Sequence, residues 1–123
     1  MGMLVRKLRL CPPIVAVDGT GLRELLHPER DHRFSGRYSL AHATLPQGKT
    51  SLKHRLKSDE VYYIISGQGE MHVDAESQPV EAGDVVDIPP KSCQWILNTG
   101  DSELEFLCIV DPAWRAQDEE LVE

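Results

Sequence analysis

The sequence is short of several features that would each point to a particular class of protein. Only three of its 123 residues are cysteines, and no two of them form a C-x-x-C pair. An odd number of cysteines argues against a disulfide framework and favours a reducing, cytoplasmic setting. No apolar run approaches the roughly 20 residues that cross a bilayer, so we expect no membrane association. The first ten residues mix bases with apolar residues, which is unlike a signal peptide.

Positive charge is also scarce. Lys and Arg number 13 against 20 Asp and Glu, and the net charge of −7 argues against a nucleic-acid partner. Residues 1–57 hold 11 bases and 4 acids (+7), whereas residues 58–123 hold 2 bases and 16 acids (−14). Such asymmetry can mark a bipartite chain. The simpler interpretation is one domain over residues 1–123, in which the two halves interleave and offset each other.

What is present is a series of short segments rich in β-branched and aromatic residues, separated by turn signals such as Pro89-Pro90. The expected strands lie at 38–44, 61–65, 70–74, 85–88, 94–97 and 104–110. Helix is expected only near 22–26 and in the tail after Asp118. Strands at this spacing, with no long helical pattern between them, predict an all-β sandwich or barrel.

Two extended segments, residues 50–56 and the strand that begins at residue 94, have faces that matter for a site, because side chains two residues apart on a strand point the same way. The sets expected to share a face are Thr50, Leu52, His54 and Leu56 on the first strand, and Gln94, Ile96 and Asn98 on the later one.

Two segments carry glycines and polar residues at a regular spacing. In 48–67, Gly48 is followed after five residues by His54, then by Glu60, and after six more by Gly67. In 83–98, Gly83 is followed after five residues by Pro89, and later by Gln94 and Asn98. This pattern resembles the paired motifs of the cupin superfamily, with Leu56, Lys91 and Gln94 standing where the motifs have His, Gly and His.

The resemblance is closest to small single-domain cupins labelled as cupin type 2 or mannose-6-phosphate isomerase-like. It implies an all-β, double-stranded β-helix, that is, a jelly-roll barrel whose mouth can hold one small ligand. The flanking strands extend the match to most of the chain, and residues 111–123 form an acidic C-terminal tail. A label of this kind describes a shared fold and does not establish a reaction.

Cupin metal sites usually use two His and the Glu of the first motif and the His of the second. By this resemblance, His54, Glu60 and Gln94 would hold a divalent ion such as iron, manganese, nickel or zinc, whereas Leu56 cannot coordinate. The alternative is a polar cavity in which Glu60 accepts a hydrogen bond from His54 and Gln94 satisfies a remaining lone pair. His42, on the strand before the first motif, is either a substitute ligand or a packing residue.

Other residues have weaker claims on chemistry. Tyr62 shares the expected face of Glu60 and is the best acid/base candidate, with barrel packing as the alternative. Cys108 lies in an apolar strand and is expected to be buried filler. Trp95 should point away from Gln94. Three further histidines are expected to be exposed to solvent: His27, His32 and His72.

Two function hypotheses follow. The first is a small-molecule-binding cupin with a reduced metal site, taking a sugar or a small carboxylate. The second is a divalent-metal-dependent enzyme, a dioxygenase, isomerase or lyase, acting on a small oxygenated substrate. The resemblance also implies a homodimer, with the N-terminal strand and the region around Trp114 as contacts.

Overall fold

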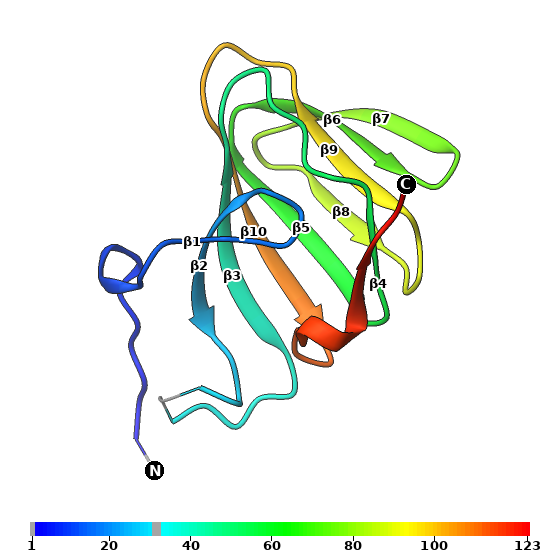
Figure 1. The fold of residues 1–123 in the computed structure, drawn as a ribbon. Coiled ribbons are helices and arrows are strands. Elements are labelled where there is room, and N and C mark those ends of the chain that lie inside the picture. The colour runs from blue at the N-terminus through cyan, green and yellow to red at the C-terminus, as the bar shows by residue number, and fades with distance from the viewer. Residues whose placement is uncertain (1, 31–32) are drawn as a thin grey trace.

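The structure, a computed structural model, describes residues 2–30 and 33–123 (Figure 1). The described elements, in chain order, are η1 (Leu8–Leu10), β1 (Ile14–Val15), β2 (Gly21–Leu26), β3 (Ser39–Leu45), β4 (His54–Leu56), β5 (Asp59–Ser66), β6 (Gln68–Val73), β7 (Glu76–Glu81), β8 (Val85–Ile88), β9 (Gln94–Asn98), β10 (Leu104–Asp111), η2 (Ala116–Asp118) and β11 (Glu119–Leu121). The all-β prediction is confirmed.

The strands form two antiparallel sheets that face each other as the walls of a barrel (Figure 1). One sheet has the order β1-β2-β3-β10-β5-β8, and the other has the order β11-β4-β9-β6-β7. Strands from the basic half of the chain pair with strands from the acidic half: β3 lies beside β10, and β4 pairs with β9 through His54 and Gln94. Strands of the two halves therefore pair within both sheets, and the single domain over residues 1–123 stays a prediction.

The core lies between the sheets and follows from alternation along the strands. On β10 every second side chain is buried, from Leu104 through Phe106 to Val110. The ring of Tyr62, on β5, packs against Phe106 with 4.6 Å between ring centroids. Gln94, Ile96 and Asn98 are all buried on one face of β9, as predicted.

Three local expectations were wrong. Residues 21–26 form strand β2 and not a helix, because they pair with β3 along most of their length. The tail after Asp118 forms β11, which pairs with β4 at the edge of the second sheet. Thr50 and Leu52 are exposed, so the shared face begins only at His54 and continues to Leu56. Tertiary pairing outweighed local propensity in the first two cases.

The turn positions of the two motifs have backbone reasons. Gly67 and Gly83 both adopt left-handed φ values, +93° and +94°, a region that glycine enters without steric cost. Lys91 stands where the second motif has glycine, and it keeps the left-handed conformation, with φ at +70°. The chain thus retains the turn geometry of the motif there even though the glycine is absent.

Asn98, the last residue of the second motif, ties two turns together. Its buried amide nitrogen donates to the carbonyl oxygens of Leu45 and Ser102, and its Oδ1 accepts from the backbone N–H of Gly100. Asn98→Ala leaves these groups without their partners, and we expect it to lower the free energy of unfolding by about 2 kcal/mol. Urea unfolding measures this; a loss no larger than that of Asp101→Ala, at an exposed neighbour, would contradict it.

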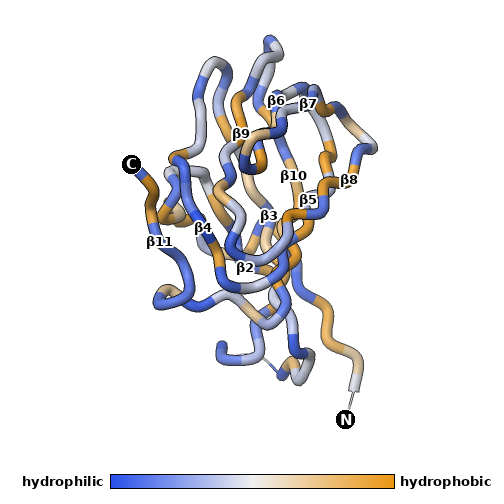
Figure 2. The backbone as a smooth tube through the Cα atoms, turned by 90° about the vertical axis from the view of Figure 1, so that its right-hand side faces the viewer, coloured by the Kyte–Doolittle hydropathy of each residue, from blue (hydrophilic) through white to orange (hydrophobic). Residues whose placement is uncertain are grey.

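The N-terminal segment before β1 extends away from the barrel, and the part nearest the N-terminus is apolar (Figures 1 and 2). Met3, Val5 and Leu10 are exposed there. The predicted homodimer, with this segment among its contacts, remains a prediction. None of the helices in residues 2–30 and 33–123 has the length and apolar character needed to span a bilayer.

Candidate functional site: an acidic barrel cavity

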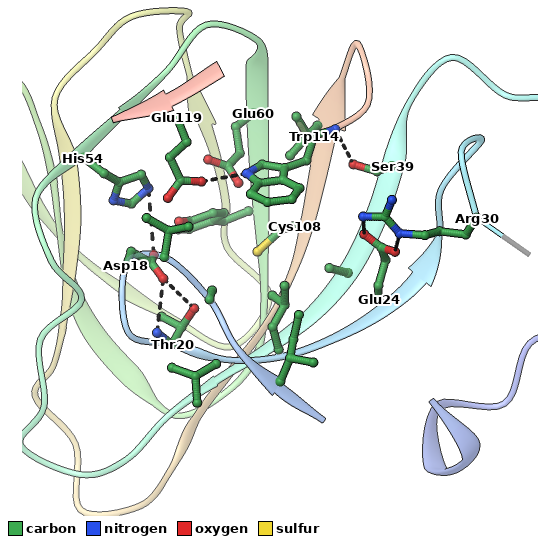
Figure 3. Close-up of a pocket in the computed structure, with 18 of the residues that line it drawn as sticks. Asp18, Thr20, Glu24, Arg30, Ser39, His54, Glu60, Cys108, Trp114 and Glu119 are labelled. Carbon is green, nitrogen blue, oxygen red and sulfur yellow. Dashed lines mark hydrogen bonds and ion pairs between the residues drawn. The ribbon is translucent and has the colours of Figure 1, made fainter. Parts of the chain in front are cut away.

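A cavity of about 480 Å³ opens between β1, β2 and the inner faces of β3, β5 and β10 (Figure 3). Its polar lining gathers at one end, where Asp18, His54, Glu60 and Glu119 lie around a common space (Figure 3). The walls toward the other end are mostly apolar, and the opposite end holds the ion pair between Arg30 and Glu24. The cavity is therefore polar and acidic at one end and apolar through its middle.

His54 is positioned by its own backbone. Its Nδ1 lies 2.8 Å from the carbonyl oxygen of Leu52, and since a carbonyl only accepts, Nδ1 carries a hydrogen and donates. The free edge of the ring is Nε2, which lies 3.8 Å from Oδ2 of Asp18. Asp18 is held in turn, because its Oδ1 accepts from both the backbone N–H and the hydroxyl of Thr20. Nε2 of His54 and Oδ2 of Asp18 are thus the atoms that these two residues present to a ligand at the acidic end of the cavity.

Glu60, Gln94 and Tyr62 form a hydrogen-bonded chain, in which Glu60 and Tyr62 line the cavity and Gln94 lies behind them. The Tyr62 hydroxyl donates to Oε1 of Gln94 at 3.1 Å, and Nε2 of Gln94 donates to Oε1 of Glu60 at 3.0 Å. The alternative of a polar cavity with internal hydrogen bonds is closest to this arrangement, although Glu60 accepts from Gln94 and not from His54. Gln94 would have to turn its oxygen away from Tyr62 to offer it fully to a metal ion, and its role as a ligand stays a prediction.

Burial sets the acid–base character of these groups. The pKa of Glu60 is raised to about 8, first by burial and then by the nearby charges of Asp18 and Glu119, against the opposing donation from Gln94. Burial likewise raises the pKa of Tyr62 well above its usual range. Tyr62 therefore stays a neutral hydrogen-bond donor at neutral pH. Tyr62 lines the cavity, and its ring also packs on Phe106, so both alternatives for this residue stay open and its role in catalysis stays a prediction.

Glu119 comes from the tail and closes the acidic end. It lies at the start of β11, and its Oε1 accepts a hydrogen bond from the indole N–H of Trp114 at 2.7 Å. Burial raises the pKa of Glu119, while the bond from Trp114 and the nearby His54 oppose that rise. Trp114 thus packs over the cavity of its own barrel, which accounts for an aromatic ring in an otherwise polar tail.

Two of the four residues at the acidic end are not among the predicted site residues. Asp18 has no predicted role, and Glu119 falls in the acidic C-terminal tail, where helix was expected. Neither position lies within the paired motifs, and neither has a pattern that marks it as buried. Asp18-Gly19-Thr20 is the one available signal, because an Asp two residues before a Thr is a common turn motif with an inward hydrogen bond.

The fit of the site to a metal ion is partial. His54 and Glu60, two of the three predicted ligands, face the cavity, and one imidazole among carboxylates is a donor set of the hard type that manganese or iron accepts. However, nowhere in residues 2–30 and 33–123 do three or more His, Cys, Asp or Glu side chains come close enough to hold an ion. The residues present do not form a ready metal centre.

The remaining candidates lie away from the acidic end. His42 faces the outside of β3, where its Nε2 contacts Oε2 of Glu105 at 2.5 Å, so it does not line the cavity. Cys108 is buried as predicted, and it lies on the cavity wall. Trp95 points away from Gln94, and its ring stacks on His72.

The expected exposure of the histidines was only partly right. His27 is fully buried, with Nε2 at 2.6 Å from the carbonyl oxygen of Trp114, so its prediction was wrong. His72 is half-buried against Trp95, with Nε2 bonded to Glu70. His32 lies outside the described residues.

Two known proteins are similar in sequence to most of this chain. It is 40% identical over 113 residues to an uncharacterized protein of Methanocaldococcus jannaschii, covering 90% of this chain and 88% of that protein. It is 31% identical to an oxalate-binding protein of Thermotoga maritima, covering 89% of this chain and 93% of that protein.

Solved structures agree on the fold. A predicted oxalate decarboxylase from Thermotoga maritima superposes with a TM-score of 0.76 at 26% identity, covering 89% of this chain and 99% of that one. Pac13, a nucleoside dehydratase of Streptomyces, shares the fold with a TM-score of 0.79 at 20% identity, covering 99% of this chain and 92% of that one. A family model described as the cupin domain matches residues 41–110. The chain belongs to the cupin family.

Proposed function

We propose that this chain binds a small carboxylate in its barrel cavity. The observation that carries the proposal is the cavity of about 480 Å³, whose polar groups converge at one end and whose walls are otherwise apolar, as in most small-molecule sites. The relative named an oxalate-binding protein supports a carboxylate as the ligand class. A sugar is the other ligand that an acceptor-rich cavity would suit.

Charge limits how such a ligand binds. Asp18 and Glu119 face the acidic end, and a second anion beside them is repelled in a cavity that is largely shielded from water. We therefore expect millimolar and not nanomolar affinity for a bare carboxylate. We also propose that the protein works in a reducing, cytoplasmic setting, which its three free cysteines support.

The second candidate is a divalent-metal-dependent enzyme acting on a small oxygenated substrate. The free Nε2 edge of His54, facing Asp18, favours it, because an imidazole nitrogen and carboxylates are common ligands of catalytic metals. When bound, such an ion would polarise a carbonyl oxygen of the substrate. His54 and Glu60 are the residues that would hold it.

Thermal unfolding of chelator-treated protein distinguishes the two. Saturating oxalate or glycolate should raise the melting temperature by a few degrees, since a ligand at 100 times its Kd contributes about 2.7 kcal/mol. Ala41→Leu, which fills the cavity wall on β3, should abolish the shift. Thr44→Leu, on the outer face of the same strand, should preserve it.

A shift that occurs only after manganese, iron, nickel or zinc is added would overturn the binding-module proposal and support the enzyme. Equal shifts in Ala41→Leu and the unmodified chain would place the ligand outside the cavity.

A further inference from the structure

The two ends of the cavity differ in charge, and they set the direction in which a ligand lies. Figure 3 shows Asp18, His54 and Glu119 at one end and the Arg30–Glu24 pair at the other, with Cys108 and Trp114 between them. The proposed function leaves open which end receives the carboxylate.

The acidic end does not suit a carboxylate. It presents three carboxyl groups, from Asp18, Glu60 and Glu119, and within the described residues the one basic side chain at ion-pair distance from any of them is His54, 3.8 Å from Asp18. Oxygen acceptors dominate this end, so it suits a group that donates hydrogen bonds, such as a hydroxyl.

The opposite end holds a cation that has no carboxylate partner among the described residues. Arg6 is an exposed residue that lines the cavity there. Its Nε donates to the carbonyl oxygen of Leu25, beside Glu24 in β2, and its Nη2 contacts Sγ of Cys11 at 3.8 Å, which leaves three N–H groups for a ligand. Arg30 is matched by Glu24 at 2.6 Å, whereas no ion pair joins Arg6 to an acid in the described parts of the chain. A guanidinium with free N–H groups at a cavity mouth is a suitable partner for a carboxylate.

The stretch between the ends is apolar. The apolar lining includes Val15, Val17, Leu22, Val110 and Trp114. A dicarboxylate as small as oxalate would reach only one end of a cavity of about 480 Å³, and it would leave these walls uncovered.

We infer that the cavity selects an elongated hydroxy acid: its carboxylate on Arg6 at the mouth, its apolar chain between β1 and Trp114, and its distal hydroxyl donating to Asp18 or Glu119. This inference rests on the proposed function, because it names the kind of carboxylate and its orientation.

Calorimetric titration of chelator-treated protein at neutral pH tests it with two matched series. The ω-hydroxy acids are glycolate, 4-hydroxybutyrate and 6-hydroxyhexanoate, and the dicarboxylates are oxalate, succinate and adipate. Affinity should rise along the first series by about threefold for each added methylene, as apolar surface is buried. Adipate should bind at least about tenfold more weakly than 6-hydroxyhexanoate, because its second carboxylate meets the acidic end.

Variants separate the two ends. Arg6→Gln should weaken 6-hydroxyhexanoate about tenfold and leave 1,6-hexanediol unchanged, whereas Arg9→Gln, which removes an exposed charge of the same sign nearby, should change neither. Glu119→Gln keeps an acceptor for the indole N–H of Trp114. It should reduce the difference in affinity between adipate and 6-hydroxyhexanoate.

Affinities that do not grow with chain length, or adipate binding as tightly as 6-hydroxyhexanoate, would overturn the inference. If oxalate and glycolate bind in the cavity and the longer acids do not, the inference fails while the proposed function stands. If no member of either series binds, both fail.

Discussion

Replacing Glu60 by Gln should make this protein markedly more stable above pH 8 and leave it nearly unchanged near pH 5. Glu60 is buried, and its pKa in the folded protein is about 8, compared with about 4.3 for an unfolded glutamate. Between these two values the folded chain holds a proton that the unfolded chain releases. The free energy of unfolding therefore falls as pH rises through this window, by up to about 1.4 kcal/mol per pH unit.

The difference between Glu60→Gln and the unmodified chain isolates this effect, because contributions from all other groups cancel. The difference in the free energy of unfolding should be near zero around pH 5 and reach on the order of 4 kcal/mol at pH 9, with a melting temperature higher by about 15 °C. The amide oxygen introduced by Glu60→Gln would still accept the hydrogen bond from Gln94. Urea unfolding of chelator-treated protein across pH 5–9 provides the measurement.

Glu76→Gln is the matched control, because it removes an exposed carboxylate from β7. Its pH profile should run parallel to that of the unmodified chain. If the pH profile of Glu60→Gln also runs parallel to that of the unmodified chain, then Glu60 is ionised in the folded protein at neutral pH. The acidic end would then carry the negative charge of Glu60 in addition to those of Asp18 and Glu119.

Introducing an imidazole at position 56 should convert the site into a competent metal centre. Leu56 is buried, two residues beyond His54 on the same face of β4. Leu56→His would add a nitrogen ligand beside His54 and Glu60, and we expect zinc or nickel affinity to rise at least about 10- to 100-fold, since even outer-shell groups change affinity by that factor. The metal-free variant should be less stable by about 2 kcal/mol, because a polar ring replaces an apolar side chain.

Competition with a chelating dye, together with elemental analysis, measures the affinity. Leu52→His serves as the control, because Leu52 is exposed and the substitution adds an imidazole outside the barrel. Equal affinities in the two variants would show that position 56 does not reach the predicted metal centre. Loss of the gained metal in Leu56→His combined with Glu60→Ala would identify Glu60 as a ligand.

The barrel could be predicted from the sequence because its signals are local. Buried and exposed side chains alternate along β10, glycines mark the turns, and the two motifs each span no more than 20 residues, 48–67 and 83–98. Each of these signals depends on residues that are close together in the chain. The helix expected at 22–26 failed because an apolar segment of that length has no period that separates strand from helix. Only its pairing with β3 decides the matter, and that pairing joins residues far apart in sequence.

The site was only half predictable, for a related reason. His54 and Glu60 stand at motif positions, so their place inside the barrel followed from spacing. Asp18 reaches the cavity from the loop between β1 and β2, and Glu119 reaches it from β11, which pairs with β4 at the edge of the other sheet (Figure 1). The burial of His27 has the same origin, since its partner is the backbone of Trp114.

The place of β11 has a practical consequence. Glu119 is four residues before Glu123, and a purification tag fused after Glu123 would directly follow the strand that closes the acidic end of the cavity. Moreover, the stretch that identifies the family, residues 41–110, contains neither Asp18 nor Glu119. Two proteins that match the family equally well over residues 41–110 can therefore differ at the positions of Asp18 and Glu119, which are half of the polar residues at the acidic end. For this barrel, ligand preference should therefore be traced through the segments that flank residues 41–110 as well as through those residues.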